Sequence, residues 1–155
     1  MKTLARQRDK AEVLRRLRAL RPESARRWGL MSAHQMVCHL GDGFRMMIGQ
    51  TPVRPIAVPL PRTVMKWIAL YVPVHWPAGR IRTSPEFDQV RRGTGTKPVD
   101  FAADVAEVET LMERALAPMG GHQRQPHPVF GPMSEADWLR WGYLHMDHHL
   151  RQFGA

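Results

Sequence analysis

The sequence predicts an all-helical protein, a four-helix bundle with one short extra helix and a middle loop rich in proline and glycine. Four long segments repeat apolar residues with the 3.6-residue period of a helix that buries one face. No segment alternates apolar and polar residues as a half-buried strand does. The 155 residues contain no internal repeat and no long linker, so we expect one domain over residues 1–155.

The first two helices are predicted before Gly49. The first covers residues 9–20 and ends before Pro22, since a proline disfavours helical backbone in the residue before it. Its apolar stripe consists of Val13, Leu14, Leu17 and Leu20. The second covers residues 32–48, where Ser32 and Gln35 have the spacing of a capping box. Its apolar face consists of Ala33, Met36, Val37, Leu40, Phe44 and Met47.

The irregular part of the chain covers residues 50–98. It contains many prolines, and a short helix is expected over residues 62–71. The residues of that helix that we expect to face inward are Met65, Ile68 and Ala69. A loop is expected over residues 77–86.

Two further long helices follow. One covers residues 100–117 and should end at Pro118, Gly120 and Gly121. Its apolar side consists of Phe101, Val105, Val108, Met112 and Ala115. The other covers residues 134–153, with Ser134 as the N-cap and Asp137 three residues later.

Composition and charge limit the classes of function. Cys38 is the only cysteine, so the chain has no intramolecular disulfide, which fits a reducing compartment. No secretory signal is recognisable, and the longest apolar run, residues 67–74, is far shorter than the ~20 residues of a membrane span. We therefore expect a cytoplasmic protein without a membrane partner.

A net charge of +9 raises the alternative of nucleic-acid binding, because many arginines lie between Arg6 and Arg27. No aromatic residue precedes Trp28 that would stack on bases, and no helix-turn-helix or zinc-finger spacing occurs. We interpret the basic residues as a solvated helix face and expect no specific nucleic-acid partner.

Histidines on the last predicted helix carry the strongest functional pattern. His145 and His149 are four residues apart, so they lie on one helix face, and the face also holds Trp138 and Trp141. Two imidazoles at this spacing can bind one metal ion. The residue after the first histidine is Met146, so the glutamate of the His-Glu-x-x-His metalloproteases is missing. The alternative is a set of partly exposed helix residues.

His39 completes a candidate site from another helix. It lies at the border of the apolar face of the second predicted helix, and Gly43 one turn later leaves space beside it. One histidine from one helix and two from another make a three-imidazole site. Such a site suits Zn, Ni or Fe and leaves one coordination position for water or substrate.

Other polar residues are weaker candidates. Cys38 lies about a quarter turn from His39, so we interpret it as a core residue rather than a fourth ligand, although His34 shares its face. His148 is either a proton shuttle at the rim or, as we favour, a surface or supporting residue. Asp42 and Asp147 could orient ligands. His127 more simply shapes the loop before the last helix.

Three stretches of the chain resemble a known family. They are residues 28–39 (WGLMSAHQMVCH), residues 77–86 (PAGRIRTSPE), and residues 127–131 (HPVFG) leading to residues 145–154 (HMDHHLRQFG). Together they resemble the DinB/YfiT-like metalloenzyme superfamily, and most closely a small subfamily of unknown function that ends in HxxHHxxQFG. The resemblance implies a four-helix bundle with a three-histidine metal site, and the matching positions are His39, His145 and His149.

Two kinds of function are open for the candidate site, and the resemblance implies the first. As an enzyme, the protein would use the metal to activate water or a low-molecular-weight thiol for attack on a small molecule, as a hydrolase or a thiol S-transferase. As a non-catalytic alternative, it would bind metal or a small ligand in a stress-response module. The expected partners are a small-molecule substrate, with a thiol among the candidates, and a second copy of the chain in a homodimer.

Overall fold

Five α-helices and one short 3-10 helix form the computed structural model, which describes residues 1–80, 84–91, 93–117 and 124–155. The elements are α1 (Gln7–Arg18), α2 (Ala33–Met47), α3 (Arg62–Tyr71), η1 (Pro85–Phe87), α4 (Phe101–Leu116) and α5 (Glu135–Gln152). Within these described ranges there is no strand, and the one backbone bridge pairs His127 with Gly131. The prediction of an all-α protein is thus confirmed for this part of the chain.

Two capping boxes fix the beginnings of the helices that carry the candidate histidines. At α2, Ser32 Oγ accepts the N–H of Gln35 at 3.1 Å, and the Gln35 side chain accepts the N–H of Ser32 at 2.9 Å. Ser134 and Asp137 make the same reciprocal pair at α5, at 3.1 and 3.0 Å. Both helices therefore begin where the sequence predicts, because each box satisfies backbone donors that the first turn leaves free.

The ends of the other helices differ slightly from the prediction. Helix α1 ends at Arg18 rather than at residue 20, because the N–H of Leu20 turns back to the carbonyl of Leu17 at 3.1 Å. Asp100 caps α4 by accepting the N–H of Ala103 at 2.8 Å. The residues predicted to end that helix, Pro118, Gly120 and Gly121, lie outside the described residues.

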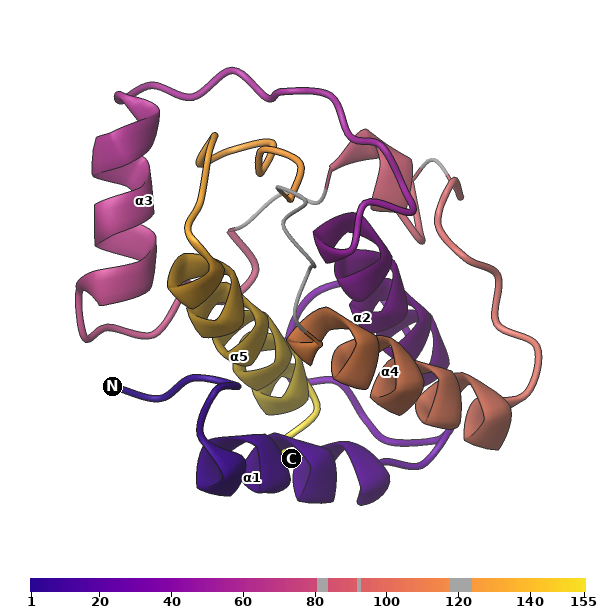
Figure 1. Cartoon of the computed structure of the whole chain (residues 1–155). Coiled ribbons are helices and arrows are strands. Elements are labelled where there is room, and N and C mark those ends of the chain that lie inside the picture. Colours follow the sequence, from indigo (N-terminus) through magenta and orange to yellow (C-terminus); the bar gives the residue numbers. More distant parts are fainter. Residues whose placement is uncertain (81–83, 92, 118–123) are drawn as a thin grey trace.

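Helices α1, α2, α4 and α5 enclose the main core. Helix α2 contacts α4 and α5, and α1 contacts the same two helices. Figure 1 shows α1 running across one end of this group, while α3 stands beside α5, against which it packs. The fully buried Trp138 of α5 and Phe44 of α2 belong to this core. The histidine-bearing faces of α2 and α5 are thus turned towards each other inside the protein.

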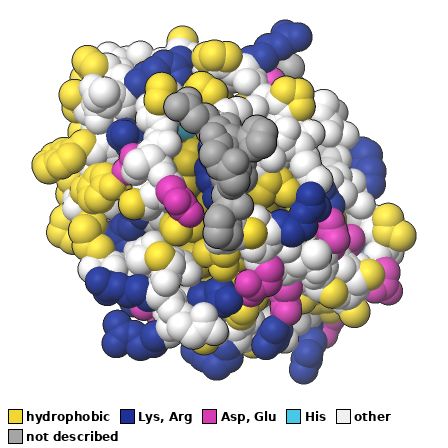
Figure 2. Space-filling model, in the orientation of Figure 1, with side chains coloured by type: hydrophobic (Ala, Val, Ile, Leu, Met, Phe, Trp, Pro, Cys, Tyr) yellow, Lys and Arg dark blue, Asp and Glu magenta, His cyan; other side chains and the backbone are white. Residues whose placement is uncertain are grey.

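Helix α3 confirms two of the three residues predicted to face inward, because Met65 and Ala69 are partly buried against the core. Leu70 is its fully buried residue, whereas Ile68, predicted to face inward, is 41% exposed. The reason is that α3 packs against α5 along one edge, which leaves part of its apolar surface exposed. Trp67 is 61% exposed, and Figure 2 shows hydrophobic side chains gathered at the left of the molecule, where α3 lies in Figure 1.

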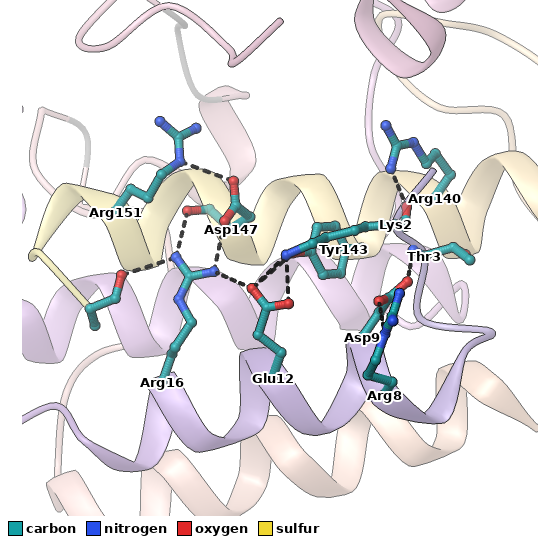
Figure 3. A network of polar contacts seen from close by, with 11 residues as sticks. Lys2, Thr3, Arg8, Asp9, Glu12, Arg16, Arg140, Tyr143, Asp147 and Arg151 are labelled. Atoms are coloured by element: carbon teal, nitrogen blue, oxygen red, sulfur yellow. Dashed lines mark hydrogen bonds and ion pairs between the residues drawn. The ribbon is translucent and has the colours of Figure 1, made fainter. Parts of the chain in front are cut away.

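Helix α1 also differs from a simple solvated basic face. Arg16 is largely buried and donates to Asp147 of α5 at 2.7 Å. Figure 3 shows Arg16 between Asp147 and Glu12, within a network that joins α1 to α5. Arg18 pairs with Glu109 of α4 at 2.7 Å. Part of the basic charge therefore holds helices together.

Among the described helices, none has the length and apolar character to cross a membrane.

Candidate metal site

Three buried histidines meet where α2 faces α5. One nitrogen from each of His39, His145 and His149 lies within 4.8 Å of the others. The Nε2 atoms of His39 and His145 are 3.2 Å apart, and the His149 ring centre is 4.7 Å from that of His39. Each residue is at most 9% exposed. The structure thus brings together the three histidines that the sequence singled out.

Neighbouring residues fix the ring of His145. Trp141, one turn earlier in α5, stacks on it with 4.6 Å between ring centres and an interplanar angle of 14°. Gly43 of α2 lies close to both rings. A Cβ atom at position 43 would come within 2.8 Å of Cε1 of His145, so only glycine leaves room for the imidazole. The space predicted beside Gly43 is therefore used by a histidine from α5.

Gln152 determines which nitrogen of His149 faces the cluster. The Nε2 amide of Gln152 donates to the carbonyl of Trp28 at 2.9 Å, so its Oε1 is left as an acceptor. Nδ1 of His149 lies 3.0 Å from that oxygen and must carry the proton. The Nε2 lone pair of His149 is then free. Such an outer contact sets the tautomer of a metal-binding histidine.

Burial keeps the three histidines uncharged at neutral pH. It is the largest cause that lowers the pKa of His39, and Asp42 acts against it. The pKa values of His145 and His149 lie well below the ordinary value, again chiefly because of burial and then because of the neighbouring histidines. Neutral imidazoles are the form that binds metal ions.

His148 is buried as well, so of the two positions favoured for it, at the surface or in support of the site, the surface position is wrong. The residue is 6% exposed, and its ring lies 5.1 Å from that of His149, centre to centre. Trp28 and Trp76 cover it at 6.1 and 5.9 Å. Its Nδ1 has no hydrogen-bond partner among the described residues, and burial lowers its pKa to about 4.

His127 shapes its own loop, as the sequence predicts. Its Nδ1 accepts the backbone N–H groups of Val129 and Phe130, at 3.2 and 3.3 Å. Its ring stacks on that of Phe130 with 4.4 Å between centres. Burial lowers its pKa to about 3. His127 therefore remains neutral and holds the loop against Trp141, at 5.3 Å between rings.

The other polar candidates lie away from the three histidines. Asp42 accepts from Gln89 Nε2 at 2.9 Å and from the N–H of Thr96, also at 2.9 Å, so it holds the loop before α4. Asp147 pairs with Arg16 on the opposite side of α5. Cys38 points to α4, and burial, followed by the nearby Asp104 carboxylate, raises the pKa of its thiol to about 12. Neither aspartate contacts the three histidines.

An apolar cavity of about 420 Å³ opens from the three histidines. His39, His145, His148 and His149 lie along it together with Trp141 and apolar residues from α2, α3 and the loops. A second cavity of about 640 Å³, lined in part by Arg80 and Arg91, meets the same helix at His148 and His149. The cavity residues outside the long helices, such as Trp76 and Phe87, could not be predicted, because no periodic pattern in the sequence marks them.

The chain matches over residues 3–155 the model of a family described as protein of unknown function, DUF1569. The chain belongs to this family. No curated protein and no solved structure shows significant similarity to it. The matched DUF1569 region includes all three clustered histidines, and the family description assigns them no role.

Proposed function

We propose that His39, His145 and His149 bind one divalent transition metal ion, Zn, Ni or Fe, and that the protein uses it to activate water or a low-molecular-weight thiol. The activated group would attack a small molecule held in the apolar cavity. The observation that carries the proposal is the cluster of three neutral imidazoles at the wall of that cavity.

The distances fit a metal better than they fit a hydrophobic core. Tetrahedral zinc with bonds of about 2.0–2.1 Å to nitrogen separates its ligand atoms by about 3.3–3.4 Å. The 3.2 Å between Nε2 of His39 and Nε2 of His145 is close to this separation. Without an ion, one hydrogen bond at most joins these two buried atoms. Buried polar atoms in this state favour a ligand.

The chain's own residues prepare the site. Gln152 holds the His149 tautomer, and Trp141 with Gly43 holds the plane of His145. The apolar walls exclude bulk water from a bound molecule, which strengthens electrostatic interactions there. A bound ion would lower the pKa of the water or thiol in the open coordination position.

Hydrolase and thiol S-transferase chemistry are both compatible with this arrangement. The resemblance to the DinB/YfiT-like superfamily supports the same reading, because its ligands fall on His39, His145 and His149. We extend the resemblance to the fold and propose that α1, α2, α4 and α5 form its four-helix bundle, with α3 as the extra helix. The contacts among these four helices support that assignment.

A non-catalytic metal or small-ligand binder is the second candidate. It is favoured by the absence of aspartate and glutamate from the described lining of the apolar cavity, where histidines are the ionisable residues. A general base of carboxylate type is thus missing from that part of the wall. The same three histidines would then bind a metal whose remaining position takes up the ligand.

Two measurements test the proposal. Elemental analysis of protein purified without a metal-affinity tag should find at least one equivalent of transition metal per chain. Metal removal should lower the melting temperature, and return of the metal should restore it, because an ion that binds only the folded state stabilises it. Metal-loaded protein is then assayed with thiols and epoxide or maleyl-type electrophiles. Protein that binds no transition metal would refute both candidates, and metal binding without turnover would favour the second.

A further inference from the structure

A second group of ligand-type side chains lies between α2 and α4. It consists of His34 and Cys38, one turn apart on α2, and Asp104 near the start of α4. One ligand atom from each lies within 4.8 Å of the others. Nε2 of His34 is 2.6 Å from Oδ2 of Asp104, and Sγ of Cys38 donates to the same oxygen at 3.6 Å.

We propose that His34, Cys38 and Asp104 bind a second divalent metal ion, zinc in preference to harder cations. The site is separate from the three-histidine cluster. Imidazole nitrogen, thiolate sulfur and carboxylate oxygen are the three atom types that bind zinc in proteins. Magnesium and calcium prefer oxygen alone, so this mixed set selects against them.

The present distances are close to those that zinc requires. Bonds of about 2.0 Å to oxygen or nitrogen and about 2.3 Å to sulfur place the ligand atoms of a tetrahedral site with one sulfur about 3.3–3.5 Å apart. The 3.6 Å between Cys38 Sγ and Asp104 Oδ2 is close to this range. The 2.6 Å between His34 Nε2 and Asp104 Oδ2 is a hydrogen-bond distance and must lengthen, which a small side-chain rotation provides. Binding would release the thiol proton to solvent.

Access and packing suit a structural or exchangeable ion. The side chains of His34 and Asp104 are 20% and 21% exposed, so an ion can enter from solvent, whereas Cys38 is buried. The edge of the Phe101 ring packs against His34 with 5.3 Å between centres and limits its movement. Because its ligands come from both helices, the ion would join α2 to α4 directly.

Cobalt substitution tests the site in the wild-type chain. Cys38 is the only cysteine, so a thiolate-to-cobalt charge-transfer band in the near ultraviolet reports on this site alone. Three imidazoles give no such band. We expect the band to grow to saturation as Co²⁺ is added and to disappear when Zn²⁺ displaces the cobalt. Saturation with cobalt without this band would overturn the proposal, whether or not any variant folds.

Matched variants locate the other ligands. Cys38→Ser should abolish the band, and Asp104→Asn and His34→Ala should each weaken cobalt binding at this site at least tenfold. Glu107→Gln, which removes an exposed carboxylate from the same helix, should leave the band unchanged. An Asp104→Asn chain that keeps wild-type affinity would overturn the assignment. His149→Ala should keep the band, so failure of this site and failure of the three-histidine site are distinguishable.

Discussion

The two sides of α5 differ in how their polar side chains are paired. On the side that faces α1, Asp147 receives Arg16 and Arg151, at 2.7 and 2.9 Å, and Tyr143 donates to Glu12 at 3.3 Å. Figure 3 shows these partners as a continuous network. On the side that faces α2, His145 and His149 crowd against other imidazoles. His148 leaves one ring nitrogen without a hydrogen bond in the described structure.

The contrast separates a stabilising surface from the surface that we propose to bind a ligand. Charges that are paired across two helices fix how the helices pack, and the pairing compensates for their loss of water. Buried neutral imidazoles without enough partners lose hydration and gain little in return. A single helix therefore carries an anchor on one side and a candidate ligand site on the other. Substitutions on the two sides should affect different measurements.

The largest expected effect is the loss of a proposed ligand. His39→Ala, His145→Ala and His149→Ala should each remove one equivalent of bound metal per chain, because two imidazoles hold a divalent ion far more weakly than three. His148→Ala and His75→Ala should keep that equivalent, as measured by elemental analysis after dialysis. His122 lies outside the described residues and offers no control. An equal loss of bound metal in His148→Ala would show that the proposed set of ligands is wrong.

A smaller effect is expected from the residue that orients His149. Gln152→Leu removes the acceptor from Nδ1 of His149 and should weaken metal binding about 10- to 100-fold, the usual cost of losing such an outer contact. Gln152→Glu keeps the acceptor and should recover part of the affinity. Competition with a chromophoric chelator measures both. Equal affinities of wild type and Gln152→Leu would contradict the tautomer argument.

On the α1 side the expected change is in stability alone. Arg16→Met leaves Asp147 with one partner fewer in a largely buried place and should lower the free energy of unfolding by about 2 kcal/mol. Metal affinity should stay at the wild-type value. Arg151→Met, which removes the more exposed partner of Asp147, should cost less than about 1 kcal/mol. Urea unfolding of metal-free protein compares the stabilities of the two variants. A loss of metal affinity in Arg16→Met would contradict the prediction that substitutions on the α1 side of α5 leave metal binding unchanged.

The smallest effect concerns acid stability at the start of α5. Tyr71, the N–H of Ser134 and Lys66 outweigh burial and hold the pKa of Asp137 at about 2, below its ordinary 3.8. The ionised carboxylate therefore stabilises the fold above pH 4, and this contribution disappears as the pH falls from about 4 to 2. Asp137→Asn should be less stable than wild type by about 1 kcal/mol at pH 6, allowing for solvent screening.

A comparison of the stabilities of wild type and Asp137→Asn across pH tests this prediction. Urea unfolding at pH 6 and at pH 2 should show the difference between wild type and Asp137→Asn shrinking towards zero. Other carboxylates titrate in both chains and cancel in the difference. A difference that stays constant over this range would show that Asp137 contributes through packing and not through its charge.

Local rules predicted most of the helices. Ser32 and Ser134 bind backbone groups three residues away, so short stretches of sequence determine where α2 and α5 begin. The four-residue spacing of His145 and His149 is local in the same sense. The approach of His39 to them followed from a border position on an apolar face, which is a weaker signal, and from the family resemblance.

The features that the sequence did not predict depend on contacts between residues far apart in the chain. His148 is buried because Trp28 and Trp76, from loops far away in the chain, pack against it. No periodic pattern in the sequence predicts these contacts. Leu70 rather than Ile68 is buried in α3 because that helix packs along one edge against α5. The arginine of α1 that meets Asp147 could not be distinguished from its solvated neighbours, since all of them follow the same helical pattern.

The 3.2 Å approach of the His39 and His145 nitrogens has a consequence for folding and evolution. In the metal-free chain it is a point of local frustration, where neighbouring contacts oppose one another in an otherwise consistent core. Replacing these histidines with apolar residues of similar volume would relieve the conflict and smooth the energy landscape of the apoprotein. Selection for stability alone would remove them. If the cluster binds an ion as proposed, the most stable sequence for this fold and the sequence that binds the ion are different sequences.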